Sequence, residues 1–136
     1  MGNDFKSIKR VLIRVDYNVP IHNGVISDLT RIQATIPTIN FFLNLGKQII
    51  LISHLGRPKG NDQNYSLKVI VKQLSKLLNR TVFFYSDWLT NTINLDNQPD
   101  VILLENLRFY SGEKNNDTFF AKRLSKYGDI YVNDAF

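Results

Sequence analysis

The run of residues 48–52, Gln-Ile-Ile-Leu-Ile, constrains the fold more than any other feature of the chain. It is almost wholly apolar and rich in β-branched residues. Such a run predicts a short strand covered on both faces, which is typical of a parallel sheet. Residues 53–58, Ser-His-Leu-Gly-Arg-Pro, follow it directly and would lie at its carboxyl end. Ligands bind at that end in open α/β sheets, so we interpret this segment as a binding loop with His54 and Arg57 as candidate anion ligands.

Four more apolar runs predict strands of the same sheet, at residues 11–15, 81–85, 101–104 and 129–132. Apolar residues at helical spacing predict helices between them, over 29–45, over 66–78, in a short stretch after 86, and over about 120–127. Strands that alternate with helices form right-handed βαβ units, and these units build a parallel sheet with helices on both faces. The predicted fold is therefore an α/β domain, a three-layer α/β/α Rossmann-like domain with a mainly parallel sheet.

The predicted helix over residues 29–45 contains a proline and begins near an arginine. Pro37 has no backbone N–H, so we expect a kink near residues 33–37. Arg31 falls in the first turn, where a cation opposes the helix dipole. An anion bound beside Arg31 would remove that cost.

The connections between elements carry their own signals. Asn23 and Gly24 stand between apolar residues and predict a tight hairpin turn. A capping residue at 86 or 87 predicts a short helix through Trp88 and onward to residue 93. Residues 94–99 are expected to form a polar loop.

Length and composition narrow the class of protein. The 136 residues are 43% hydrophobic and 21% charged, which fits one globular domain. There is no cysteine, the first residues lack an apolar signal core, and no run approaches the roughly 20 apolar residues of a membrane span. We therefore expect a cytoplasmic protein with no membrane partner. The net charge of +5 comes from scattered Lys and Arg with no run of five, which leaves small anionic ligands and nucleic acid both open.

Polar side chains follow several of the predicted strands, and in a parallel sheet these strand ends share one edge. Arginine presents a planar fork of donors that matches phosphate or carboxylate, while a carboxylate or an amide can bind a hydroxyl group. Together they predict a site for a small phosphorylated hydroxy acid. The residues are Asp16, Asn18, Arg31, His54, Arg57 and Arg108.

Each of these residues also has an ordinary structural explanation, as a loop cap, a turn or an ion pair; only their shared edge favours a site. Two alternatives stay open on the residues alone. One is a free-standing module that binds small anions. The other is a module that binds single-stranded nucleic acid by charge and by stacking on Tyr17, Phe109 and Tyr110.

Five segments of the chain resemble, in order, the signature motifs of the amino-terminal domain of phosphoglycerate kinase. They are residues 14–20 (Arg-Val-Asp-Tyr-Asn-Val-Pro), 30–32 (Thr-Arg-Ile), 53–58, 104–109 (Leu-Glu-Asn-Leu-Arg-Phe) and 128–136 (Gly-Asp-Ile-Tyr-Val-Asn-Asp-Ala-Phe). The resemblance runs from about Val11 to Phe136. Tyr17 stands where the family commonly has Phe.

The resemblance implies a glycolytic enzyme, EC 2.7.2.3, that moves a phosphoryl group reversibly between 1,3-bisphosphoglycerate and ADP to give 3-phosphoglycerate and ATP. It implies that Asp16 and Asn18 bind the hydroxyl and carboxylate region of the substrate, and that Arg31 is the catalytic arginine. It also implies that His54, Arg57 and Arg108 bind the phosphate end of the substrate. The full set of substrate-binding residues is then Asp16, Tyr17, Asn18, Arg31, His54, Leu55, Gly56, Arg57 and Arg108, with no metal ligand among them.

The resemblance also implies that residues 1–136 are an incomplete amino-terminal domain, ending just before the family's Gly-Thr-Ala-His-Arg-Ala-His segment. The family's sheet has six strands in the order 3-4-2-1-5-6, and only five are predicted here, which would leave an unpaired edge beside the fifth. Mg-ATP or Mg-ADP would be bound by a carboxyl-terminal domain that these residues lack. We therefore expect this chain to bind no cofactor or nucleic acid and to be inactive alone, and the full enzyme to be a monomer.

Overall fold

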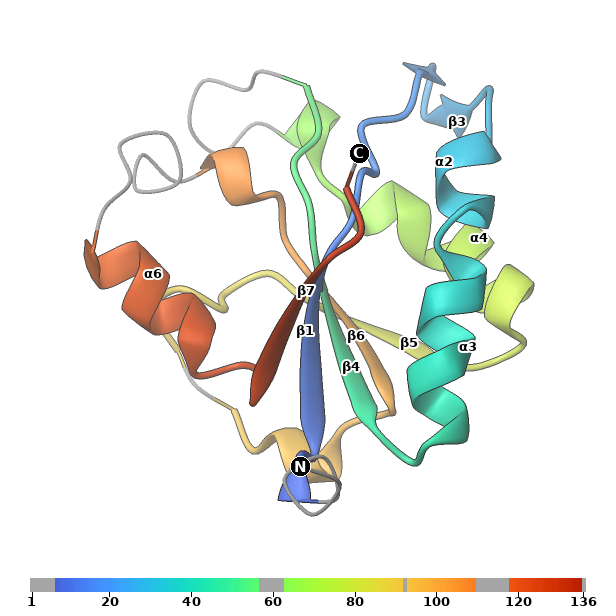
Figure 1. Ribbon diagram of the computed structural model, residues 1–136. Helices are drawn as coiled ribbons and strands as arrows, with labels where there is room; N and C mark the ends of the chain where they lie inside the picture. The colour runs from blue at the N-terminus through green and yellow to red at the C-terminus, as the bar shows by residue number, and fades with distance from the viewer. Residues whose placement is uncertain (1–6, 57–62, 92, 110–117, 136) are drawn as a thin grey trace.

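A computed structural model describes residues 7–56, 63–91, 93–109 and 118–135. A parallel five-stranded sheet forms its centre, in the order β5-β6-β4-β1-β7 (Figure 1). This confirms the predicted fold class, and the strand order agrees with the order 3-4-2-1-5 expected from the resemblance. The strands are β1 (Arg10–Arg14), β4 (Gln48–Ile52), β5 (Val82–Tyr85), β6 (Val101–Leu104) and β7 (Ile130–Asn133).

Strand β1 lies inside the sheet and pairs with β4, which follows soon after it in the sequence, and with β7, which lies far from it in the sequence. Val11 stands opposite Ile49 of β4 on one side and opposite Ile130 of β7 on the other. In the described part of the chain, β7 has a neighbouring strand on this one side only. All the strands run the same way, so their carboxyl ends meet at one edge, at the top of Figure 1.

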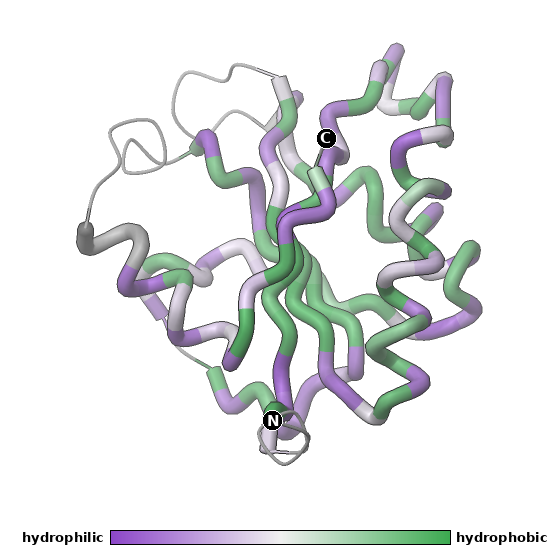
Figure 2. Tube along the Cα trace, in the orientation of Figure 1, coloured by the Kyte–Doolittle hydropathy of each residue, from purple (hydrophilic) through white to green (hydrophobic). Residues whose placement is uncertain are grey.

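The alternation of side chains along each strand separates two apolar cores. On β1, Val11 and Ile13 belong to one buried cluster and Leu12 to the other, and the strands are the most continuously apolar part of the molecule (Figure 2). The first cluster lies under α3 (Ile36–Asn44) and α4 (Lys68–Leu78), which cover one face of the sheet (Figure 1). Burial of both faces explains why these strands carry so few polar residues.

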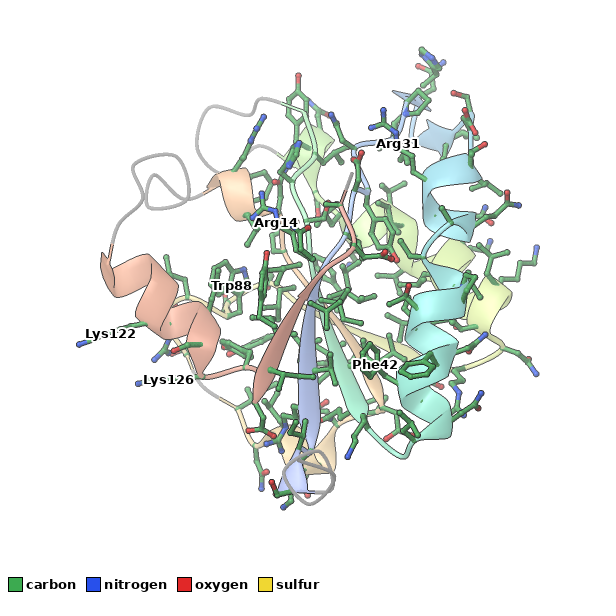
Figure 3. All side chains as sticks on the ribbon, viewed as in Figure 1. Arg14, Arg31, Phe42, Trp88, Lys122 and Lys126 are labelled. Atoms are coloured by element: carbon green, nitrogen blue, oxygen red, sulfur yellow. The ribbon has the colours of Figure 1, made fainter. Side chains whose placement is uncertain are left out.

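The opposite face is covered by α6 (Thr118–Ser125) and by the segment that follows β5 (Figure 1). Trp88 is fully buried there, between α6 and the sheet, as Figure 3 shows. Its indole packs edge-to-face on Tyr127, with ring centroids 6.3 Å apart. The Tyr127 hydroxyl donates to the Trp88 carbonyl oxygen at 2.6 Å. The two polar ends of these large rings are therefore satisfied inside the core.

The predicted single kinked helix over residues 29–45 is wrong, because the structure has two helices. They are α2 (Thr30–Gln33) and α3, separated by Ala34 and Thr35. Pro37 lies in the first turn of α3, where its missing N–H costs no hydrogen bond. The Thr35 hydroxyl donates to the Ile32 carbonyl oxygen at 2.7 Å, which gives the broken end of α2 a partner.

The predicted hairpin is confirmed, with β2 (Ile21–His22) paired to β3 (Val25–Ile26) across two residues of positive φ. The predicted short helix after residue 86 is wrong, since residues 88–90 form only a turn. The predicted polar loop over 94–99 instead contains a 3₁₀ helix, η2 (Leu95–Asn97), which Asn94 caps by accepting from the Asp96 N–H at 3.1 Å. Two further 3₁₀ turns are η1 (Gln63–Tyr65) and η3 (Leu107–Phe109).

None of the helices in the described residues is both long enough and apolar enough to cross a membrane.

Candidate functional site

Arg31 is held at the carboxyl edge of the sheet by the loop that leaves β1. Its Nη1 donates to Asp16 Oδ1 at 3.1 Å and to the Asn18 carbonyl oxygen at 2.7 Å. The Asn18 N–H in turn donates to Asp16 Oδ1 at 3.1 Å. Figure 3 shows Arg31 at the start of α2, beside this loop. About half of the Arg31 side chain remains exposed, at 52%, so an anion can approach the guanidinium from solvent.

The loops after β1, β4 and β6 are joined through Gly56. Asn18 Oδ1 accepts from the Gly56 N–H at 2.9 Å, and Arg108 Nη1 donates to the Gly56 carbonyl oxygen at 3.3 Å. The structure therefore brings Asp16, Asn18, Arg31, Gly56 and Arg108 into one hydrogen-bonded chain at the predicted edge.

Gly56 has to be glycine for two separate reasons. Its φ is +61°, in the left-handed region that side chains disfavour. A Cβ built on it would lie 2.4 Å from ring carbons of Tyr65, which is closer than atoms can pack. The loop can therefore pass under Tyr65 only without a side chain at this position.

A pocket of about 380 Å³ opens between this loop and the β2–β3 hairpin. Among the residues that line it are Asn18, Leu55, Gly56, Asn64 and Tyr65. Its volume falls at the small end of the range for ligand sites, about 300–1,000 Å³. The pocket thus borders the hydrogen-bonded chain and has room for a small metabolite.

Two of the predicted substrate-binding residues turn their side chains into the core. Tyr17 is fully buried, and its hydroxyl shares a 2.8 Å hydrogen bond with Thr35 Oγ1. Burial raises the pKa of this hydroxyl well above its ordinary value, despite the Thr35 hydrogen bond, so it stays protonated. Leu55 is 3% exposed. A contact from either residue to a ligand would have to come from its main chain.

The main chain of the loop after β4 is fixed from both neighbouring loops. Ser53 Oγ accepts from the Tyr17 N–H at 3.0 Å, and the Ser53 carbonyl oxygen accepts from the Leu107 N–H at 3.0 Å. His54 and Arg108 both lie partly exposed at this edge. The remaining predicted ligand, Arg57, lies outside the described residues.

The sequence singled out Arg108 after β6 as a ligand and gave no site role to the two polar residues at positions 105 and 106. Glu105 is 4% exposed and Asn106 is fully buried. Glu105 Oε2 accepts from Ser66 Oγ at 2.7 Å and Oε1 accepts from the Leu67 N–H at 2.9 Å, so the carboxylate caps the start of α4. The sequence did carry one indication of this role: Glu105 directly follows a wholly apolar strand, where the chain is still inside the fold.

The donors and acceptors of this edge suit an anion that also carries a hydroxyl group. Guanidinium groups bind phosphate or carboxylate, and the Asp16 carboxylate and Asn18 amide can bind a hydroxyl. Among the described residues, no three His, Cys, Asp or Glu side chains gather where they could hold a metal ion. The fixed donors of Arg31 and Arg108 can recognise an anion and stabilise its charge.

Comparison with known proteins agrees with this arrangement. The family model for phosphoglycerate kinase matches residues 3–136. The chain is 52% identical over 132 residues to phosphoglycerate kinase of Wolbachia pipientis subsp. Culex pipiens, covering 94% of this chain and 33% of that protein. It is 50% identical over 141 residues to phosphoglycerate kinase of Borreliella afzelii, covering 98% of this chain and 36% of that protein. The chain thus spans about one third of the length of these curated relatives.

Solved structures give the same assignment. The fold superimposes on phosphoglycerate kinase from Coxiella burnetii with a TM-score of 0.83 and 40% identity, over 93% of this chain and 32% of that one. It superimposes on phosphoglycerate kinase from Pyrococcus horikoshii with a TM-score of 0.80 and 32% identity, over 93% and 34%. Motifs, strand order and these similarities agree, and the chain belongs to the phosphoglycerate kinase family.

Proposed function

We propose that the carboxyl edge of this sheet binds the glycerate substrate of a phosphoglycerate kinase, either 3-phosphoglycerate or 1,3-bisphosphoglycerate. The observation that carries the proposal is the hydrogen-bonded chain from Arg31 through Asp16, Asn18 and Gly56 to Arg108. It fixes two guanidinium groups, one carboxylate and one amide at a single edge. Family membership supports the same ligand.

The roles follow from the chemistry of each group. Asp16 and Asn18 bind the hydroxyl and carboxylate region of the glycerate, while His54 and Arg108, with Arg57 from outside the described residues, bind its phosphate end. Arg31 stabilises negative charge on the phosphoryl group as it moves. That group leaves the acyl oxygen of 1,3-bisphosphoglycerate and bonds to a terminal oxygen of ADP, a reaction that depends on positioning and electrostatics.

The complete reaction needs a magnesium nucleotide, and we assign its binding to parts of the protein outside these residues. The relatives are about three times as long as the matched segment. The isolated 136 residues are therefore proposed to bind substrate without turnover. In the full-length protein they would serve reversible phosphoryl transfer in glycolysis, in the cytoplasm.

Binding of single-stranded nucleic acid is disfavoured by where the aromatic rings lie. That alternative relied on stacking by Tyr17, Phe109 and Tyr110. Tyr17 is fully buried and Phe109 is 9% exposed, so neither presents a ring face to a base. Tyr110 lies outside the described residues.

Calorimetric titration with 3-phosphoglycerate tests the proposal. We expect saturable binding that Arg108→Met weakens strongly and that Arg80→Met leaves unchanged. Arg80 makes a matched control because it is an exposed arginine paired with Asp100 at 3.5 Å, away from the site. A short oligonucleotide titrated at about 50 and 200 mM salt should show no specific binding, whereas a nucleic-acid protein would show affinity that falls steeply with salt.

Two outcomes would overturn the proposal. One is that 3-phosphoglycerate does not bind to the protein expressed at the full length its gene encodes. The other is that Arg108→Met and Arg80→Met bind it equally well. Reading the gene past codon 136 tests the assignment of nucleotide binding separately, and turnover by the isolated 136 residues would contradict that assignment.

A further inference from the structure

Asn106 uses the full hydrogen-bonding capacity of its side chain inside the protein. Oδ1 accepts from the Leu55 N–H at 3.1 Å and from the Arg108 N–H at 3.0 Å. Nδ2 donates to the Leu55 carbonyl oxygen and to the Tyr65 carbonyl oxygen, both at 2.8 Å. A carboxamide has two acceptor sites and two donors, and all four are engaged. The residue is fully buried, so in the folded protein these groups bond to Asn106 out of reach of bulk water.

These four bonds join the segments that carry the site. Leu55 lies in the loop after β4, where it precedes Gly56. Tyr65 supplies the ring under which Gly56 passes. Arg108 follows β6 and donates back to the Gly56 carbonyl oxygen. The Asn106 amide therefore sets the distance between the loop after β4 and the Arg108 backbone, although no atom of Asn106 is exposed to a ligand.

We propose that Asn106 is a positioning residue for the phosphoglycerate site, holding the loop after β4 in register with Arg108. This inference rests on the proposed function, because the site it serves is the one assigned there. No other side chain of this size can replace it: Asp offers acceptors only when ionised, Ser is too short to reach three segments, and Leu has no polar atoms.

The expected consequence is a loss of ligand discrimination as well as of stability. The affinity of a ligand that touches several groups at once depends on the spacing of those groups, just as a misplacement of about 1 Å in an active site can lower a reaction rate a hundredfold. Inorganic phosphate touches fewer groups and depends less on that spacing. A residue that only stabilises the fold behaves differently, because partial unfolding lowers the apparent affinity for every ligand by the same factor.

The test compares Asn106→Ala with the wild type and with Leu95→Ala, each in the protein at the full length its gene encodes. Leu95 is buried in the core cluster under α6, and its carbonyl oxygen bonds to Gln48 at the opposite edge of the sheet, so the control loses core contacts away from the site. Affinities for 3-phosphoglycerate and for inorganic phosphate are measured by calorimetry and ³¹P NMR. We expect Asn106→Ala to weaken the binding of 3-phosphoglycerate about tenfold or more and the binding of phosphate less than about threefold. Leu95→Ala should preserve the ratio of the two affinities.

Equal losses for both ligands in Asn106→Ala would overturn the inference while leaving the proposed function intact. If the wild type binds no 3-phosphoglycerate, the proposed function itself fails. If Asn106→Ala does not fold, amide hydrogen exchange in the wild type tests the inference instead. We expect the Leu55 and Arg108 amides to exchange as slowly as amides inside β4, and exchange at the rate of an open loop would overturn the inference.

Discussion

The two edges of the sheet hold their arginine side chains in different ways. At the amino edge, carboxylates bond to the groups that they neutralise or cap. Asp129 Oδ2 accepts from the Lys9 and Arg10 N–H groups at 2.8 and 3.1 Å, and the Arg10 guanidinium pairs with Asp96. Each contact there ties one strand or turn to the next. The charged groups at this edge therefore stabilise the fold.

At the carboxyl edge, the cations are held in part by neutral oxygens. Arg31 donates to the Asn18 carbonyl oxygen, and Arg108 donates to the Gly56 carbonyl oxygen. A carbonyl fixes the position of a guanidinium without cancelling its charge. If the carboxyl edge binds the substrate as we propose, the partner of a charged group, more than its presence, separates a binding edge from a structural one. Four predictions test this contrast.

The largest effect is expected from Arg31→Met at the carboxyl edge, set against Arg10→Met at the amino edge. Loss of Arg31 should lower kcat/KM of the full-length protein about 10²–10³-fold, because a fixed donor to the moving phosphoryl group is lost. It should leave thermal stability nearly unchanged, since the side chain is half exposed. Arg10→Met should instead cost about 1 kcal/mol of unfolding free energy and keep turnover. A reversed pattern would refute the distinction between the edges.

A pair of glycines flanking β4 gives the next largest contrast. Gly56→Ala places a methyl group against Tyr65 at the carboxyl edge, so we expect loss of phosphoglycerate binding and more than about 2 kcal/mol of destabilisation. Gly46 has a φ of +77° at the amino edge, with open space around its Cβ position. Gly46→Ala should cost only about 1–2 kcal/mol, from backbone strain, and leave binding intact. Chemical denaturation and calorimetry together measure both effects.

Tyr17→Phe separates the core beneath the site from the site itself. Removing the hydroxyl breaks its hydrogen bond to Thr35, while Thr35 keeps its bond to the Ile32 carbonyl oxygen. We expect about 1 kcal/mol of destabilisation and less than a twofold change in 3-phosphoglycerate affinity. A large loss of 3-phosphoglycerate affinity in a variant that keeps its stability in urea denaturation would show that the Tyr17 side chain contributes to binding directly.

The smallest effect concerns pH and Asp129 at the amino edge. Hydrogen bonds from the Lys9 and Arg10 N–H groups hold the pKa of this carboxyl below its ordinary value. Its contribution is therefore present above about pH 4 and is lost as the pH falls through the lowered pKa of the folded state. Because Asp129 is exposed, Asp129→Asn should cost less than about 1 kcal/mol at pH 7. The stabilities of the two proteins should begin to converge below about pH 4 and meet once the pH is below the lowered pKa of the folded state, with substrate affinity unchanged at pH 7.

The sequence predicted the sheet well because its strands are buried on both faces and therefore read as apolar runs. Residues 48–52 and 101–104 were recognised in this way, and placing polar residues at their ends followed from parallel topology. The break between α2 and α3 was harder to predict from the sequence. Pro37 fits either a kink inside one helix or the first turn of a new one, and local sequence cannot choose between them.

At the site, the direction of the side chains was the part that the sequence prediction left out. Asp16 and Asn18 face the edge, whereas Val15, Tyr17 and Val19 are buried, so the loop continues the two-residue alternation of β1. That period could have excluded the Tyr17 ring from the site. The role of Asn106 could not have been predicted, because its partners at Leu55 and Tyr65 are more than 40 residues away.

The position of β1 in the sheet determines when the pairing on its two sides can be completed during synthesis. Its partner β4 emerges early, but its other partner, β7, is among the last described residues. At about 5–20 residues per second, one side of β1 waits several seconds on the ribosome for its neighbour. Until then, the backbone groups on that edge of β1, over residues 11–14, lack the strand with which they pair. The interval before residue 130 is made is therefore when the nascent protein is most exposed to mispairing, and when a chaperone would have most to protect.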